Sequence, residues 1–227
     1  MAIFPLSNFC LKSVALDLTI YPERKIRPVT DGFDKKVTYK TQFERYDKAV
    51  KNGFYFEAML IVYAIIEDRL RAWLFYLGCL NTRQSTRFDN KRSKNELKFM
   101  FDECEDNKFR FPSINQISGK RKIIEATLTW AENGYNNADK SNYLCAIRKV
   151  YTDKLDIKKV REVFTRMNEW CSYRNEVIHA LMNKNTESLN SGLADRISEG
   201  MDIARDFDNL VKKIKRSGVI RKSLNLK

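Results

Sequence analysis

The sequence predicts an all-α fold, a helical bundle of about five or six helices with an irregular N-terminal arm. Long segments carry apolar residues at helical spacing, and three of the four prolines lie within the first 40 residues. Of the 227 residues, 43% are hydrophobic, which is enough for one real core. We divide the chain into an arm at 1–40, a helical domain at 41–216 and a basic tail at 217–227.

The arm is predicted from breaker residues and short alternating patterns. It holds Pro5, Pro22 and Pro28, the turn-like stretch "TDGFDKK", and "VALDLTIY", which indicates a short strand or two. The first 20 residues lack a basic region followed by an unbroken apolar core, so no signal peptide is predicted. The helical body is expected to begin near Thr41.

The segment from Gly53 to Leu77 has the broad apolar face of a core helix, and Gly78 is a natural stop. Its longest apolar run, "AMLIVYAII", is too short to span a bilayer and leads directly into charged residues. We therefore expect no membrane partner.

The rest of the domain alternates polar loops with helical patterns. The polar stretch 81–98 predicts a loop leading into a helix near Lys94, and "NGYNNADKSN" predicts a loop between two shorter helices. Further helices are predicted at 118–132, 141–150, 157–170 and 187–214.

The charge balance favours an anionic partner. Lys and Arg number 42 against 29 acidic residues, for a net charge of +13, and the calculated pI is about 9.5. Residues 212–227 carry seven basic side chains and no acidic one, so they form either a solvated end or a nucleic-acid-binding extension. Nucleic acid is the expected partner class.

Several kinds of chemistry are excluded by missing signatures. No G-x-S-x-G is present, "SGKRK" lacks the rest of a phosphate-binding loop, and one histidine excludes H-E-x-x-H metal sites. Five cysteines without a C-x-x-C pair favour neither disulfides nor a zinc knuckle, and fit a reducing cytoplasm. The acidic cluster Asp102, Glu103, Glu105 and Asp106 is interpreted as a solvated helix end. No cofactor and no metal are expected.

The stretch "SYRNEVIHALMN", residues 172–183, contains the single histidine, His179, five residues after Arg174. The preceding apolar stripe continues to position 174, so we expect Arg174 near an inward or partner-facing surface, where it needs a carboxylate or a phosphate. On an ideal helix, positions 174 and 179 point about 140° apart. They converge only if the helix is irregular, if it starts near Ser172 as N-cap, or if a second copy pairs with it.

The hexapeptide "RNEVIH" resembles the R-x(4–6)-H motif of the HEPN superfamily of all-α domains. The resemblance implies a metal-independent endoribonuclease of the toxin, abortive-infection or CRISPR-associated kind, acting on RNA as a homodimer. It implies Arg174 and His179 as the catalytic pair, Asn175 as a supporting residue, and an antitoxin or defence-system partner. Leu181 stands where members paired with nucleotidyltransferases often carry Tyr, so that pairing is not expected.

The residue types suit this chemistry. RNA cleavage without metal uses the 2′-hydroxyl as nucleophile, and an imidazole, which titrates near neutrality, can move the protons. A guanidinium stabilises the charge on the phosphorane. Two alternatives remain: a HEPN-like subunit that binds RNA or regulates or inhibits a nuclease without catalysis, and a DNA-binding helical regulator, for which no helix-turn-helix is recognisable.

Overall fold

The computed structural model describes residues 32–83, 85–104, 110–133, 141–181, 183, 185 and 192–226. All regular elements in these ranges are helices, which confirms the predicted all-α class. Eight helices are present there, against the five or six predicted. They are α1 (Gly32–Lys51), α2 (Tyr55–Tyr76), α3 (Lys91–Cys104), α4 (Ile117–Asn133), α5 (Asn142–Lys154), α6 (Ile157–Ala180), α8 (Leu193–Ser217) and α9 (Val219–Ser223).

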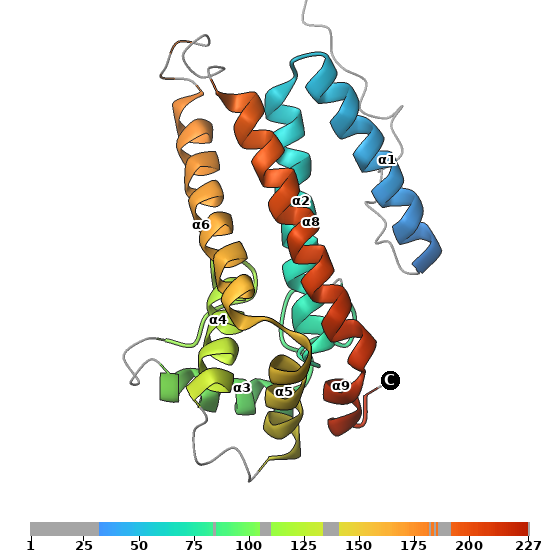
Figure 1. Ribbon diagram of the computed structural model, residues 1–227, viewed down its shortest axis with the longest axis vertical. Helices are drawn as coiled ribbons and strands as arrows, with labels where there is room; N and C mark the ends of the chain where they lie inside the picture. Colours follow the sequence, from blue (N-terminus) through green and yellow to red (C-terminus); the bar gives the residue numbers. More distant parts are fainter. Residues whose placement is uncertain are drawn as a thin grey trace, which may run out of the picture.

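The long helices α1, α2, α6 and α8 run side by side, and α3, α4, α5 and α9 gather around one end of them (Figure 1). Helix α2 packs against both α1 and α8, and α6 packs against α8. None of the described helices has both the length and the apolar character needed to cross a membrane.

The core is centred on aromatic side chains that join α2, α5, α6 and α8. The ring of Trp73 stacks on Phe207 and meets the edges of Tyr151 and Phe164. Its indole nitrogen donates to the Tyr151 hydroxyl at 2.8 Å, so the buried polar atoms of both side chains are satisfied. This cluster fixes α6, the helix that carries the motif, against the bundle.

Helix α1 begins at Gly32, nine positions before the predicted start at Thr41. Residues 32–40 are therefore helical, and the prediction of an irregular arm is wrong for them. A tertiary contact accounts for the difference, because Lys35 Nζ and Tyr39 OH bond to the two carboxylate oxygens of Asp68 in α2, at 2.5 and 2.7 Å. The rest of the predicted arm and its strands lie outside the described residues.

The basic tail is partly built into the fold. Helix α2 ends before Gly78, as predicted, with a φ of 76° at this glycine. Ile220 and Leu224 are buried beside this end. Arg221 Nη1 donates to the Phe75 carbonyl at 2.9 Å, which satisfies a carbonyl at the C-terminus of α2. Residues 218–224 are thus a packed part of the domain and not a solvated end.

Candidate active site on helix α6

Helix α6 passes through the motif without interruption. It begins after Asp156, whose carboxylate accepts the Lys159 backbone N–H at 3.2 Å, and it continues to Ala180. Of the three conditions for convergence, a helix start at Ser172 is therefore excluded. The buried stripe that contains Met167 and Trp170 extends to Val177, so packing carries the helix past Ser172.

An exposed stripe of α6 carries part of the motif. Ser172, Asn175, Glu176 and His179 are exposed, and Asn175 and Glu176 each lie three or four residues from both Ser172 and His179. Asn175 and His179 are four residues apart and point only about 40° apart around the helix, whereas Arg174 and His179 point about 140° apart. Backbone geometry thus brings Asn175 close to His179 and keeps Arg174 away from it.

The side chain of Arg174 bends toward Asn175. Its Nη1 atom donates to Asn175 Oδ1 at 2.9 Å, and its guanidinium carbon lies 4.0 Å from the centre of the Tyr63 ring in α2. The sequence led us to expect a carboxylate or a phosphate beside Arg174. Among the described residues, the contacts of Arg174 are an aromatic face and an amide, which hold the guanidinium without neutralising its charge.

A pocket of about 450 Å³ opens beside this arrangement, between α2, α6 and the start of α4. Its lining includes Tyr63 and Glu67 from α2, Arg121 from α4, and Asn168 and Asn175 from α6. Neither Arg174 nor His179 belongs to the lining. The pocket therefore adjoins the motif through Asn175.

Three buried polar atoms at this site lack a hydrogen-bond partner among the residues that the structure describes: Arg121 Nε, Asn168 Oδ1 and Arg174 Nε. Buried polar atoms in folded proteins almost always have a partner, supplied by protein, water or ligand. Water is the simplest partner for these atoms.

The surroundings of the pocket fix the protonation states of Glu67 and Cys171. Burial works against the charged form of Glu67, yet Lys120 Nζ at 3.1 Å and Arg71 Nη2 at 2.9 Å outweigh it and lower the pKa of this carboxyl. Glu67 is thus a carboxylate at neutral pH and not a general acid. Burial also raises the pKa of the Cys171 thiol, although Arg121 and Arg174 oppose this, so Cys171 is not a thiolate nucleophile.

His179 lies in the last turn of α6, with an exposed side chain. Its backbone carbonyl accepts the Asn183 side-chain amide at 3.3 Å. In the parts of the chain that the structure describes, its imidazole has no hydrogen-bond partner. The ring is thus open to a group that approaches from outside.

The acidic cluster begins at Asp102, at the C-terminal end of α3. Asp102 pairs with Lys98 at 2.5 Å, one turn away on α3, as a solvated helix surface would. Glu105 and Asp106 lie outside the described residues. Across the described ranges, no three His, Cys, Asp or Glu side chains are close enough together to hold a metal ion.

The motif identified three residues, but the sequence did not reveal their neighbours. Tyr63 and Arg121 come from helices 50 or more residues upstream of the motif, and nothing in their local pattern distinguishes them from other helix residues. Glu67 is noticeable in the sequence only as a polar residue within an apolar helix. Tyr63 sits at a half-buried position of a helix that sequence analysis treated only as core.

No protein-family model, no curated protein and no solved structure matches this chain. A functional assignment consequently depends on the motif and on the geometry described above.

Proposed function

We propose that this protein is a metal-independent endoribonuclease of the HEPN kind, whose active site uses Arg174, Asn175 and His179. The observation that carries the proposal is the arrangement of Arg174, which retains its positive charge between Tyr63 and Asn175, beside an exposed stripe that bears the single histidine. A fixed cation and an accessible imidazole are the two groups that cleavage by 2′-hydroxyl attack requires.

In the proposed reaction, the 2′-oxygen of the RNA attacks the adjacent phosphorus and the bond from phosphorus to the 5′-oxygen breaks. A 2′,3′-cyclic phosphate and a 5′-hydroxyl result. The His179 imidazole takes the proton of the 2′-hydroxyl, and the imidazolium so formed returns a proton to the leaving 5′-oxygen. Arg174 stabilises the charge on the phosphorane, and Asn175 holds the guanidinium in place.

The site is proposed to be shared between two copies of the chain. Within one copy, Arg174 and His179 point about 140° apart, so a symmetric pair of α6 helices is the arrangement that brings one Arg174 to the other His179. Two exposed apolar side chains near the site are available for such a contact. Leu181, 39% exposed, follows the motif directly, and Leu60, 49% exposed, lies one turn before Tyr63 in α2.

The second candidate is an RNA-binding or regulatory subunit that has the motif but does not cleave. The observation that favours it is the absence of a hydrogen-bond partner for the His179 imidazole in the described residues, because catalytic imidazoles are commonly oriented by a second group. An antitoxin or other defence-system partner fits either candidate.

Cleavage of single-stranded RNA in the presence of EDTA separates the two candidates. The active-site proposal expects His179→Ala to slow cleavage by about 100-fold or more. The matched control is Glu176→Ala, which alters the same exposed stripe one turn away and should change the rate less than about threefold. Equal cleavage by His179→Ala and the wild type overturns the proposal, as does cleavage that requires a metal. RNA binding without cleavage supports the second candidate.

A further inference from the structure

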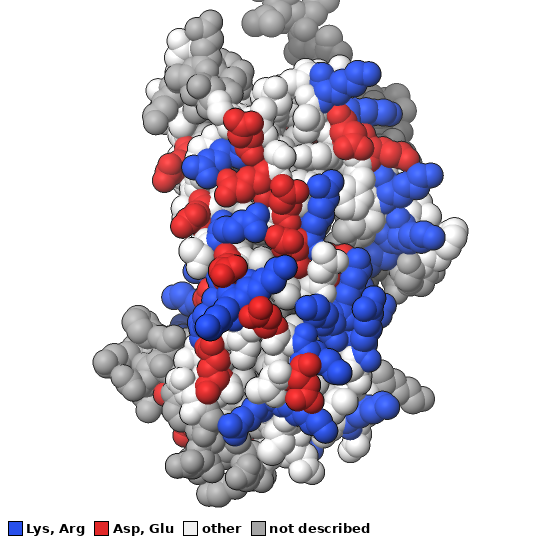
Figure 2. Space-filling model, viewed as in Figure 1, with Lys and Arg blue, Asp and Glu red and all other residues white. Residues whose placement is uncertain are grey.

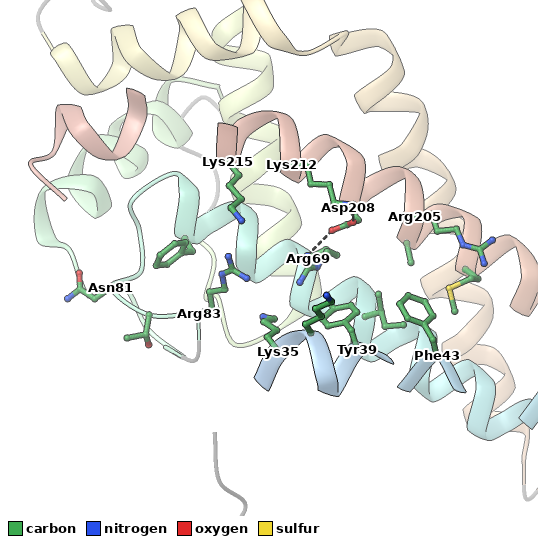
Figure 3. Close-up of a pocket in the computed structure, with 16 residues that line it drawn as sticks. Lys35, Tyr39, Phe43, Arg69, Asn81, Arg83, Arg205, Asp208, Lys212 and Lys215 are labelled. Atoms are coloured by element: carbon green, nitrogen blue, oxygen red, sulfur yellow. Dashed lines mark hydrogen bonds and ion pairs between the residues drawn. The ribbon is translucent and has the colours of Figure 1, made fainter. Parts of the chain in front are cut away.

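A second pocket, of about 790 Å³, lies on another side of the bundle, between α1, α2 and α8 (Figure 3). Its volume falls within the range of sites for small molecules, which is roughly 300 to 1,000 Å³. Glu67 faces the α6 site and Arg69 faces this pocket, and these two residues of α2 point about 160° apart. The two sites are therefore on nearly opposite sides of α2.

One end of the pocket is strongly cationic. Lys35 from α1, Arg69 from α2, Arg83 from the loop after α2, and Lys212 and Lys215 from α8 converge there (Figure 3). Figure 2 shows the same trend on the surface, where Lys and Arg side chains gather over the C-terminal half of α8 and along α1.

The carboxylates at this end do not balance the cations. Asp208 is the acidic residue of the lining, and it accepts from Arg69 at 2.7 Å and from Lys212 at 2.6 Å. Asp68, beside the pocket, pairs with Arg69 and with Lys35 at 2.5 Å. Two carboxylates thus face five cations, and a net positive charge remains.

Three of the five cations are also held in place and partly shielded from water, whereas Lys212 and Lys215 are exposed. The Lys35 and Arg69 side chains are only 19% and 12% exposed. Arg83 lies over the rings of Phe75 and Tyr76, with its guanidinium carbon 5.6 and 5.3 Å from the ring centres. Burial lowers the pKa of Lys35 despite its ion pair with Asp68, and the charges of Arg83 and Arg69 act in the same direction. An added anion would relieve this repulsion.

The other end of the pocket is mainly apolar. Phe43 from α1 lies there, beside Arg205 of α8, which pairs with Asp202 at 3.2 Å (Figure 3). Ile65 from α2 and Met201 and Ala204 from α8 supply further apolar lining. Along each of the three helices, the lining changes from apolar to cationic toward the same end of the pocket. It changes from Phe43 to Lys35 on α1, from Ile65 to Arg69 on α2, and from Met201 to Lys215 on α8. The 14 residues between Met201 and Lys215 span about 21 Å of helix. Tyr39 lies between the two ends and adds an aromatic face.

From this two-ended lining we infer that the pocket binds an organic polyphosphate, a ligand with a flat or apolar group joined to two or more phosphates, as in a nucleoside triphosphate. The phosphates lie among Lys35, Arg69, Arg83, Lys212 and Lys215, and the apolar group lies against Phe43 and Met201. Charge-assisted hydrogen bonds from Arg and Lys are the usual means of holding phosphate groups. This inference does not depend on the proposed ribonuclease activity.

Calorimetric titration of the full chain with ATP, GTP, CTP and UTP in turn, with EDTA present, tests the inference. We expect at least one nucleotide to bind, and to bind more tightly than tripolyphosphate, because tripolyphosphate has nothing to place at the apolar end. Lys212→Gln/Lys215→Gln should weaken this binding by about tenfold or more. The matched control is Lys213→Gln/Arg216→Gln, which removes the same charge from residues of α8 outside the lining and should change the affinity less than about twofold.

Three results would overturn the inference. The first is that none of the four nucleotides binds, and the second is that tripolyphosphate binds as tightly as the best nucleotide. The third is that both double variants lose the same affinity. A single-stranded RNA oligonucleotide is titrated in parallel. If the pocket variant weakens RNA binding while no nucleotide binds, the pocket is part of an RNA groove and the small-ligand assignment is wrong.

Discussion

The contact between Gly200 in α8 and Trp170 in α6 holds the motif helix against the bundle, and it gives a quantitative prediction. A Cβ atom at position 200 would lie 2.4 Å from the indole ring of Trp170. The ring must then move by at least about 1 Å to reach 3.4 Å, where ordinary van der Waals contact begins. Trp170 is only 1% exposed, so little free space is available for that movement.

The expected change in the free energy of unfolding has three contributions. Overpacking a filled core costs about 1–3 kcal/mol. Movement of the ring weakens the hydrogen bond from Trp170 Nε1 to the Arg196 carbonyl, now 2.7 Å, which costs about 1 kcal/mol. The higher helix propensity of alanine returns about 1 kcal/mol. Gly200→Ala should therefore destabilise the protein by about 1–3 kcal/mol, or lower Tm by roughly 2–12 °C.

Urea denaturation followed by circular dichroism measures this loss. Ser198→Ala, at an exposed position of the same helix, is the control and should leave the stability nearly unchanged. In a Trp170→Leu background the smaller side chain leaves room for the added methyl group, so Gly200→Ala should cost little or nothing there. A Gly200→Ala protein as stable as the wild type, or an equal cost in both backgrounds, would refute this packing of α6 on α8.

Two further predictions concern charged groups. Tyr63→Leu removes the ring beneath Arg174 and should slow RNA cleavage by roughly 3- to 30-fold in single-turnover assays. The control, Tyr63→Phe, retains the aromatic face and should retain most of the rate. An unchanged rate in Tyr63→Leu would contradict the role of the ring. Burial opposes ionisation of Asp208, but Lys212 and Arg69 outweigh it and hold the pKa of this carboxyl below its ordinary value of 3.8. The carboxylate therefore contributes stability that is present above that value and is lost as pH falls through the lower folded pKa. The urea midpoint should fall less between about pH 5 and pH 2 in Asp208→Asn than in the wild type, and an identical fall in both proteins would contradict the pairing.

Local pattern was sufficient to predict the helices that bury a broad apolar face. The helices predicted at 53–77, 118–132 and 141–150 correspond to α2, α4 and α5, because their apolar spacing determines both where they form and which face they bury. The helix predicted at 187–214 corresponds to α8, which ends three residues later.

The missed elements depend on contacts between distant segments. The first turns of α1 are bonded to Asp68 in α2, and α9 is held by Arg221 against the end of the same helix. Neither segment has an apolar pattern long enough to predict a helix, so tertiary contacts decided both. The same reason explains why no helix starts at Ser172, where buried residues on either side outweigh a favourable N-cap.

The residues of the candidate site also divide into those that the sequence identified and those that only the fold brings together. Arg174, Asn175 and His179 were found because they are close together in the sequence. The ring of Tyr63 meets Arg174 only in the folded chain, and so do the five cations of the second pocket, which come from α1, α2, the loop after α2, and α8. The sequence did indicate two of their sources, since Arg83 belongs to the basic loop and Lys212 and Lys215 to the basic tail.

The central claim is that Arg174 of one copy acts with His179 of another. Mixing Arg174→Ala and His179→Ala proteins in equal amounts, after each alone is shown to be inactive on single-stranded RNA, tests this claim most directly. Half of the dimers then contain one copy of each variant, and one of their two sites combines an intact Arg174 with an intact His179. A shared site predicts that the mixture recovers roughly a quarter of the wild-type cleavage rate. A mixture as inactive as either variant alone, although the two proteins exchange subunits, would contradict it.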